Sequence, residues 1–146
     1  MIFVNLLLHL LLKIYKYRII LTNKGGFMDC LFCKIIKGEI PSYKIYEDDL
    51  VMAFLDVNPH ANGHTLIIPK KHYDDYLQLE NDLFIHVLDV AKVLHKKLET
   101  ALKCDGITML HNYGNAQQIK HYHFHLIPTY EKEEKLSLEE VFKRLN

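Results

Sequence analysis

His121-Tyr-His-Phe-His-Leu-Ile127 places a histidine at every second position, with apolar residues between them. On a β-strand, successive side chains point to opposite faces, so His121, His123 and His125 share one face while the apolar residues enter a core on the other. Alternate residues lie about 6.5–7 Å apart along a strand, and the row therefore spans about 13 Å. We expect two neighbouring imidazoles to share one phosphate and the third to have another task.

Three interpretations of this row follow from the residues alone. It can be a polar strand face that only meets solvent. It can be a metal site, because His-x-His on a strand supplies two zinc ligands. It can bind phosphate, because the loop Asn112–Gln117 offers a glycine and amide donors to an anion. A neutral imidazole is also a nucleophile near pH 7 and forms a phosphoramidate that water later cleaves.

The segments around the row predict an α+β domain. Residues 81–103 carry apolar side chains at helical spacing and predict one long helix, with Asp105-Gly106 as its stop signal. Strands joined by short turns predict an antiparallel sheet with helices packed on it. The other expected elements are a short helix at Leu31–Lys37, strands at Tyr43–Glu47, Val51–Val57, His64–Pro69, Ile107–His111 and Lys120–Ile127, and a last helix at Leu138–Leu145 opened by the capping box Ser137–Glu140.

The composition fits one domain with its own core. The chain has 146 residues, of which 49% are hydrophobic and 25% charged, and its formal net charge is zero. A neutral chain has no overall attraction to nucleic acid or to an anionic membrane, so any anion site must be local. Three cysteines without a scaffold pattern favour a reducing compartment, and Cys104 is expected to be a small buried residue.

Residues 1–27 differ from the rest of the sequence. An apolar run over residues 1–12 is followed by lysines and an arginine. The run is shorter than the roughly 20 residues of a membrane span, and a signal peptide would carry its charge before the run. We expect a working start at Met28, a targeting or anchor segment, or an extra helix. The predicted division is an extension at 1–27, a domain at 28–130 and a tail helix within 131–146.

The histidine stretch resembles the His-φ-His-φ-His-φ-φ signature of the histidine triad (HIT) superfamily. It is most similar to the Hint branch, nucleoside phosphoramidate hydrolases once called protein kinase C inhibitors. Cys30-Leu-Phe-Cys-Lys-Ile-Ile-Lys-Gly-Glu-Ile-Pro-Ser42, Phe54-Leu-Asp-Val-Asn-Pro59 and Gly63-His-Thr-Leu-Ile-Ile-Pro-Lys-Lys-His72 resemble that branch in the same order. The likeness runs from about Asp29 to Pro128. It implies a HIT-like sheet of about five strands with one long helix and a short N-terminal helix.

The resemblance also implies roles for the matched residues. His123 is expected to be the nucleophile on the α-phosphorus, His125 to bind the phosphate, and His64 to border the same site. Asp56 is expected to hold the ribose hydroxyls. The expected base pocket consists of Phe32, Ile35, Phe54, Val57 and Leu66, with a plain core role as the alternative for Phe54 and Leu66, and the expected neighbours of the phosphate and leaving group are Asn112, Gln117 and Gln118.

Two features depart from the family pattern and bear on the leaving group. The loop between Asn112 and His121 is shorter than usual, and Gln118 stands where animal Hint proteins carry a serine. The tail after Pro128 also differs from the short aromatic-ended tail of those proteins, which influences their choice of substrate.

Cys30 and Cys33 form a C-x-x-C pair that is a redox pair, half of a zinc site, or neither. No thioredoxin-like βαβ pattern follows the pair. His121, the spare member of the row, and His72 can complete a Cys2His2 set. Some HIT proteins, chiefly bacterial ones, have this arrangement, which implies a closed and therefore structural Zn²⁺ site.

The leading functional hypothesis is a hydrolase that cleaves purine nucleoside phosphoramidates of the adenosine 5′-monophosphoramidate type through a covalent nucleotidyl-histidine. The alternatives are a dinucleoside polyphosphate hydrolase or nucleotidyl transferase of the same superfamily, a zinc hydrolase with His123 and His125 as ligands, and a nucleotide-binding scaffold without turnover. The resemblance implies a homodimer. We expect a cytoplasmic location with the nucleus as a second one, no nucleic-acid partner, and organelle, secretory or membrane targeting only if residues 1–27 act as a leader or anchor.

Overall fold

Five antiparallel strands form one sheet in the computed structural model, which describes residues 30–146. Each strand runs antiparallel to its neighbours in the sheet. The α+β class and the five-stranded sheet predicted from the sequence are confirmed. In spatial order the strands are β1 (Lys44–Glu47), β2 (Val51–Leu55), β3 (Thr65–Pro69), β5 (Phe124–Thr129) and β4 (Gly106–His111).

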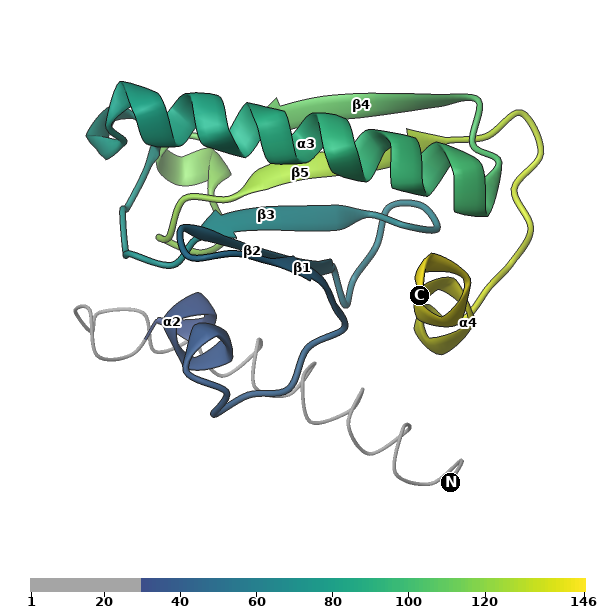
Figure 1. The fold of residues 1–146 in the computed structure, drawn as a ribbon, viewed down its shortest axis with the longest axis horizontal. Helices are drawn as coiled ribbons and strands as arrows, with labels where there is room; N and C mark the ends of the chain where they lie inside the picture. Colours follow the sequence, from purple (N-terminus) through teal and green to yellow (C-terminus); the bar gives the residue numbers. More distant parts are fainter. Residues whose placement is uncertain (1–29) are drawn as a thin grey trace.

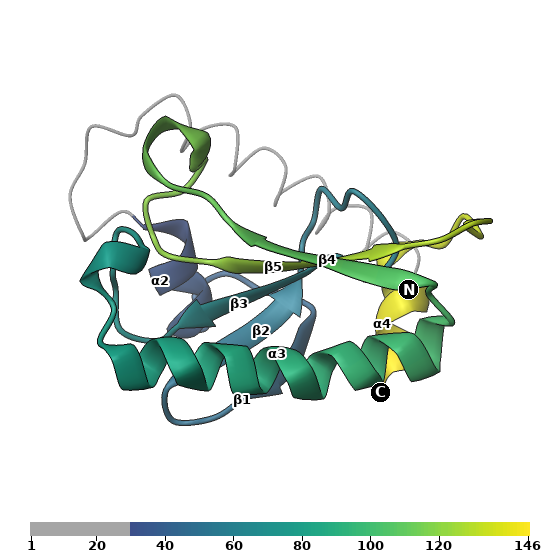
Figure 2. The same ribbon diagram turned by 90° about the horizontal axis from the view of Figure 1, so that it is seen from above.

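The helices lie around this sheet. Helix α3 runs along it, while α2 lies beyond β1 and β2, and α4 lies at the other end of the molecule from α2 (Figures 1 and 2). None of the helices in residues 30–146 is long and apolar enough to cross a membrane. The helical elements are α2 (Leu31–Ile36), the 3-10 turn η2 (Tyr76–Gln78), α3 (Asn81–Leu102), the 3-10 turn η3 (Gly114–Ala116) and α4 (Leu138–Leu145).

The central strands are buried on both faces. All five residues of β2 and all five of β3 are buried, which explains their unbroken apolar runs. Because side chains alternate along β2, Val51 and Ala53 join a core with α3, while Met52 and Phe54 join a second core with α2. The sheet therefore separates a large core from a smaller one, and the smaller one borders the histidine row.

The histidine row departs from the predicted strand. Strand β5 begins only at Phe124, so His121 and His123 lie in the irregular segment that leads into it. The predicted alternation of faces nevertheless holds. Tyr122 packs in the α3 core, whereas the rings of His121 and His123 contact Phe32 of α2. The strand is shorter because β3 pairs with β5 only as far as Phe124, opposite Ile67.

The long helix ends before its predicted stop signal. Helix α3 closes at Leu102, where Lys103 takes the left-handed conformation with φ 56° and donates its backbone N–H to Glu99. Asp105 already donates its N–H to Thr129, and Gly106 opens β4. Strand β4 thus begins one residue before the predicted start at Ile107.

The C-terminal segment packs against the domain and contacts the loop before β3. Ser137 and Glu140 form the predicted capping box, and Val141 of α4 is buried in the α3 core. The hydroxyl of Tyr130 donates to the carbonyl of Asn62 over 2.8 Å.

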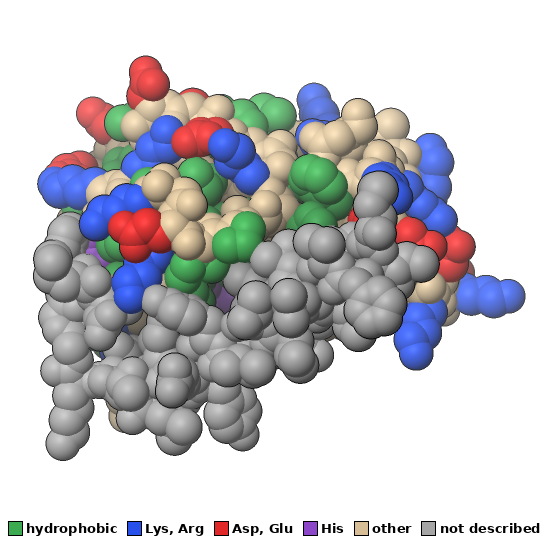
Figure 3. Space-filling view, turned by 90° about the horizontal axis from the view of Figure 1, so that it is seen from below, with side chains coloured by type: hydrophobic (Ala, Val, Ile, Leu, Met, Phe, Trp, Pro, Cys, Tyr) green, Lys and Arg blue, Asp and Glu red, His purple; other side chains and the backbone are tan. Residues whose placement is uncertain are grey.

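The face seen from below carries basic and acidic side chains side by side among its described residues (Figure 3). The expectations for residues 1–27 lie outside the residues that the structure describes.

Gly63 closes that loop in a conformation that only glycine adopts easily. Its φ is +84°, and a Cβ atom here would lie 2.5 Å from Leu102 Cδ1 and 3.0 Å from Leu98 Cδ2. Gly38 also has a positive φ, of +76°, but a Cβ there would meet no heavy atom within 4 Å. A substitution at Gly38 would therefore add backbone strain alone, whereas the same substitution at Gly63 would add both backbone strain and steric overlap with α3.

Gly63→Ala should lower the free energy of unfolding clearly more than Gly38→Ala. Both changes add left-handed backbone strain of about 1–2 kcal/mol, and only Gly63→Ala also overpacks the end of α3, at a further cost of about 1–3 kcal/mol. Urea unfolding of the two variants beside the parent measures the difference. Equal losses would show that the loop moves away from α3 without cost.

Candidate active site

Four imidazoles line one cavity, and three of them belong to the residues with predicted catalytic roles; the fourth is that of His60, for which no role was predicted. His64 precedes β3, His125 lies on β5, and His123 directly precedes β5. All three line a cavity whose empty volume, including open solvent, is about 950 Å³. The ring centroids of His123 and His125 lie 4.8 Å apart, and those of His64 and His125 lie 5.2 Å apart. The tertiary structure therefore brings together the three residues for which the sequence predicted catalytic roles.

A chain of hydrogen bonds fixes the proton positions on two of these rings. The backbone N–H of His60 donates to Nδ1 of His64 over 3.1 Å, so a neutral His64 carries its proton on Nε2. His64 Nε2 lies 2.9 Å from Nδ1 of His125 and donates to it. A neutral His125 then carries its own proton on Nε2. That Nε2 is buried and has no hydrogen-bond partner among the residues that the structure describes, so it is a donor ready for an anion.

His123 has the opposite arrangement. Its Nδ1 lies 2.7 Å from the backbone carbonyl of His121, and since a carbonyl only accepts, Nδ1 carries the proton. The Nε2 atom of a neutral His123 therefore keeps its lone pair. The ring of Phe32 meets the His123 ring edge-on, with centroids 5.2 Å apart. His123 thus offers a nucleophilic nitrogen, and His125 beside it offers a hydrogen-bond donor.

Burial keeps His125 uncharged in the absence of an anion. It lowers the pKa of His125 to about 3, reinforced by the nearby His123 and His64 and opposed by Asp56. Asp56 is itself buried at the rim of the cavity, where its Oδ1 accepts the backbone N–H of Asn58 over 2.9 Å. A bound phosphate would supply the negative charge and the acceptor that the Nε2–H of His125 lacks.

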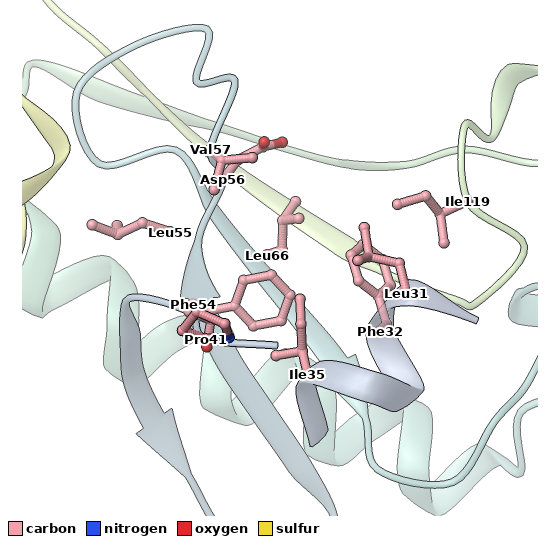
Figure 4. A pocket seen from close by; sticks show the side chains of 11 residues that line it. Leu31, Phe32, Ile35, Pro41, Phe54, Leu55, Asp56, Val57, Leu66 and Ile119 are labelled. Carbon is pink, nitrogen blue, oxygen red and sulfur yellow. The ribbon is translucent and has the colours of Figure 1, made fainter. Parts of the chain in front are cut away.

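An apolar cavity adjoins the polar one. It has an empty volume, with its open solvent, of about 420 Å³, and it shares Phe32, Asp56, Leu66 and Ile119 with the histidine cavity. Figure 4 shows side chains from α2 facing Phe54 and Leu66 of the sheet across this space. All five residues predicted for the base pocket line it: Phe32, Ile35, Phe54, Val57 and Leu66.

Five further lining residues of the apolar cavity were not predicted: Leu31, Pro41, Ser42, Leu55 and Ile119. Leu31 lies on α2, Pro41 in the turn after it, and Ile119 just before the histidine row. Leu31 and Pro41 lie inside the Cys30–Ser42 stretch that resembles the Hint branch, and this resemblance is the signal from which they could have been predicted. Ile119 comes from an irregular segment that has no periodicity to place it.

Gln117 and Gln118, in the loop before the histidine row, point to different places. Asn112 and Gln118 line the histidine cavity as expected. Gln117 is not among its lining residues, contrary to the expectation that it lies beside the phosphate. Its side chain is buried, and its Nε2 donates to the carbonyl of Asp74 over 2.8 Å. Gln117 follows η3 with an extended backbone, in which consecutive side chains point to opposite sides. Its hydrogen bond to Asp74 stabilises the loop that carries His72.

A second cluster brings together the four predicted metal ligands. One donor atom each from Cys30, Cys33, His72 and His121 lies within 4.8 Å of the others. Nδ1 of His121 is 3.4 Å from Sγ of Cys30 and 3.5 Å from Sγ of Cys33, and Nδ1 of His72 is 3.3 Å from Sγ of Cys33. Among residues 30–146, this is the group of potential ligands that contains cysteine.

The outer nitrogens of both histidines in this cluster are also bonded. His121 Nε2 donates to the carbonyl of Pro69 over 2.8 Å, and His72 Nε2 donates to Asp74 Oδ1 over 3.0 Å. Both neutral rings therefore direct an Nδ1 lone pair at the sulfurs, which is the state of a metal ligand. Burial raises the pKa of Cys33 to about 12 and lowers that of His121 to about 4, so a metal would bind neutral imidazole and displace a thiol proton.

The grouping of potential ligands bears on the zinc-hydrolase alternative. A second group in the described chain combines Asp56, His64 and His125, and His123 belongs to neither group. Nδ1 of His125 accepts from His64, so Nε2 of His125 carries a proton instead of the lone pair that a metal ligand needs. A metal held jointly by His123 and His125 therefore has no support in the arrangement of these rings.

Comparisons with known proteins agree with this geometry. The HIT domain model matches residues 37–132. The HIT-like protein MJ0866 of Methanocaldococcus jannaschii is 44% identical over 106 residues, covering 70% of this chain and 80% of that protein. The adenosine 5′-monophosphoramidase HNT1 of Saccharomyces cerevisiae is 45% identical over 101 residues, covering 68% of this chain and 61% of that protein. A Zn-bound histidine triad family protein from Mycobacterium smegmatis superimposes with a TM-score of 0.75 at 30% identity, covering 82% of this chain and 92% of that one.

The neutral, half-buried His125 should make the protein sensitive to acid. The unfolded chain takes up a proton on this residue below about pH 6.5, while the folded chain does so only near its pKa of about 3. The free energy of unfolding should therefore fall as the pH falls between these values, with His125 contributing up to about 1.4 kcal/mol per pH unit.

His125→Gln should remove that contribution, because glutamine does not titrate. Urea unfolding of the parent and the variant at pH 6.5, 5.5 and 4.5 gives the two slopes. The slope of the variant should be shallower by up to about one proton. Identical slopes would contradict the assignment of a neutral His125 in the folded protein.

Proposed function

Because the chain belongs to the histidine triad (HIT) family, we propose that it is a nucleotide hydrolase that cleaves purine nucleoside phosphoramidates of the adenosine 5′-monophosphoramidate type. The observation that carries this proposal is the pairing of two neighbouring imidazoles with opposite proton positions. His123 keeps the lone pair on Nε2, and His125 holds a buried Nε2–H without a partner among the described residues. The relative HNT1, an adenosine 5′-monophosphoramidase by name, supports the choice of substrate.

The proposed reaction has two steps at the α-phosphorus. Nε2 of His123 attacks the phosphorus, the P–N bond of the substrate breaks, and the amine leaves with a proton taken from water. Water then attacks the nucleotidyl-histidine, which releases the nucleoside monophosphate and restores the imidazole. The Nε2–H of His125 donates to a phosphate oxygen, where negative charge grows in both transition states.

The joined cavities would accommodate the rest of the nucleotide. The apolar cavity between α2 and the sheet offers flat walls to a purine, and Phe32 and Phe54 meet edge-on there with centroids 5.6 Å apart. Asp56 lies in the wall that both cavities share and is suited to accept the ribose hydroxyls. A base, a ribose and a phosphate would follow one another from the apolar to the polar end.

We also propose that the Cys30, Cys33, His72 and His121 cluster binds a structural Zn²⁺. A tetrahedral site with Zn–S of about 2.3 Å and Zn–N of about 2.0–2.1 Å has an S···N separation of about 3.6 Å. The S···N separations here are 3.3, 3.4 and 3.5 Å, so the donors are already spaced for such an ion. A bound Zn²⁺ would cross-link α2 to the loop after β3 and to the segment before β5. The Zn-bound relative from M. smegmatis supports this choice of metal.

A second candidate function is a dinucleoside polyphosphate hydrolase or nucleotidyl transferase of the same family. The size of the histidine cavity favours it, because the cavity extends past the histidines to Leu110 and Ile127 and has room for a larger leaving group. The same nucleophile would serve both reactions. Gln118, which lines this cavity, would then contact the leaving group.

We further propose a homodimer joined at β4. This strand forms an edge of the sheet, so one side of its backbone is unpaired within the described chain. Met109 on β4 and Tyr113 just after it are exposed large hydrophobic residues at this edge. For location we propose the cytoplasm, with the nucleus second, since Cys30, Cys33 and Cys104 are all free thiols.

His123→Ala should abolish turnover of adenosine 5′-phosphoramidate, with a loss of at least about 10³-fold because covalent catalysis is removed. The parent protein mixed with substrate and quenched in the pre-steady state should gain the mass of an adenylyl group on His123. His95→Ala, on the half-exposed face of α3, is the matched control and should keep the adduct and the rate. A His123→Ala protein with undiminished turnover would exclude this mechanism, and a parent that binds AMP without adduct or turnover would be a scaffold.

Cys30→Ser should lower the bound zinc from about one ion per chain to well below one, because a tetrahedral site loses a thiolate. Elemental analysis of purified protein measures this content. Cys104→Ser is the matched control, since Cys104 is also a free cysteine but is not part of the cluster. Undiminished zinc in Cys30→Ser would refute the ligand set.

A further inference from the structure

His121 belongs to the metal cluster through its ring and to the catalytic site through its backbone. Its side chain is fully buried, with Nδ1 facing the two sulfurs and Nε2–H donating to Pro69. Its carbonyl oxygen accepts the Nδ1–H of His123 over 2.7 Å. The hydrogen bond that leaves the lone pair on Nε2 of His123 therefore depends on where the peptide of His121 is held.

Phe32 provides a second link between the same two sites. It lies between Cys30 and Cys33 in the sequence, and its ring meets those of His121 and His123 with centroid separations of 5.8 and 5.2 Å. The same side chain lines both cavities. Any shift of α2 relative to His121 would therefore also shift the ring that packs against the nucleophile.

Secondary structure does little to hold either link in place. Helix α2 has six residues, fewer than a helix needs to be stable by its own hydrogen bonds. The segment from Gln118 to His123 lies outside the strand ladder, because β5 begins at Phe124. Within this segment, the backbone N–H of Tyr122 donates to the carbonyl of Tyr73 over 2.7 Å, which anchors the segment beside His72. A cross-link through the cysteines and histidines would hold α2 and the Gln118–His123 segment in fixed positions, which the strand hydrogen bonds do not.

We infer that the Cys30, Cys33, His72 and His121 cluster is a positioning site for the catalytic nucleophile, in addition to any contribution to stability. With the cluster cross-linked by a metal ion, the carbonyl of His121 holds His123 in the single tautomer that presents Nε2 to the phosphorus. Without the cross-link, the His121 peptide moves and His123 samples both tautomers. The effect on catalysis rests on the function proposed above, whereas the effect on the tautomer does not.

The test uses the full chain labelled with ¹⁵N-histidine, in the zinc-loaded state, after removal of metal by a chelator, and after reloading with Zn²⁺. Long-range ¹H–¹⁵N spectra distinguish a proton on Nδ1 from one on Nε2. His123 should carry its proton on Nδ1 in the loaded protein, show a mixture after stripping, and return on reloading. His86 is the control, because its Nε2 bonds Oδ2 of Asp48 over 2.7 Å and touches neither the metal cluster nor His123. Its spectrum should not change.

The same three samples give a kinetic readout. The single-turnover rate of adduct formation on His123 should fall by about 10–100-fold after stripping, which is the usual effect of losing an outer contact of a metal site. The affinity for AMP should fall by a smaller factor, because Phe54, Asp56 and Leu66 remain on the sheet and the strand end. Cys30→Ser should reproduce the stripped state, and Cys104→Ser should behave as the parent.

Cd²⁺ in place of Zn²⁺ provides a test in which the protein stays folded even if the stripped form does not. The larger ion should displace the ring of His121 and shift the Nδ1–H resonance of His123, with His86 unchanged. A stripped but folded protein that keeps one His123 tautomer would overturn the inference, and so would a Cd²⁺ form with an unmoved His123 resonance. A loaded protein with the expected tautomer but no adduct would overturn the proposed function alone.

Discussion

Burial of the sheet on both faces is the constraint on which the other features depend. Strands β2 and β3 are buried along their whole length, with α3 against one face and α2 against the other. Helix α3 has 22 residues, whereas α2 has six. Among the described residues, the apolar cavity lies between α2 and the sheet, and the histidine cavity adjoins it through Phe32, Asp56, Leu66 and Ile119. The site therefore lies beside the short helix, where the histidine row meets the second face of the sheet.

Directional hydrogen bonds give chemically identical rings different roles. A backbone N–H donates to His64, His64 donates to His125, and His125 is left as a donor towards the cavity. A backbone carbonyl accepts from His123 and leaves it with a lone pair instead. Donor and nucleophile are thus set before a substrate arrives, so the transition state need not reorganise them. Burial adds to this arrangement by keeping His125 neutral until an anion is present.

The metal cluster and the catalytic site meet at one residue. The ring of His121 faces the cysteines, and its carbonyl accepts from His123. The ring of Phe32, on α2, contacts the rings of both His121 and His123. A cross-link that stabilises a short helix can therefore also align a nucleophile, because both tasks require the same peptide to stay in place. In the proposed arrangement, His121 would be a metal ligand through its ring and a positioning residue through its carbonyl.

Periodicity in the sequence predicted the fold class and the two faces of the histidine row, because burial on a strand or helix repeats at a fixed spacing, as it does for Met52 and Phe54 on β2. The family resemblance supplied the five base-pocket residues that line the apolar cavity, and five other lining residues were not predicted. Neither signal predicted where β5 begins, that Gln117 and Gln118 point to different sites, or which imidazole nitrogen carries each proton. Those features depend on partners distant in sequence, such as Asp74 for Gln117 and His64 for His125, and no local pattern encodes them. The sequence thus predicted most residues of the site. Which nitrogen of each imidazole carries the proton depends on the tertiary structure, because it brings the hydrogen-bond partners of these rings together.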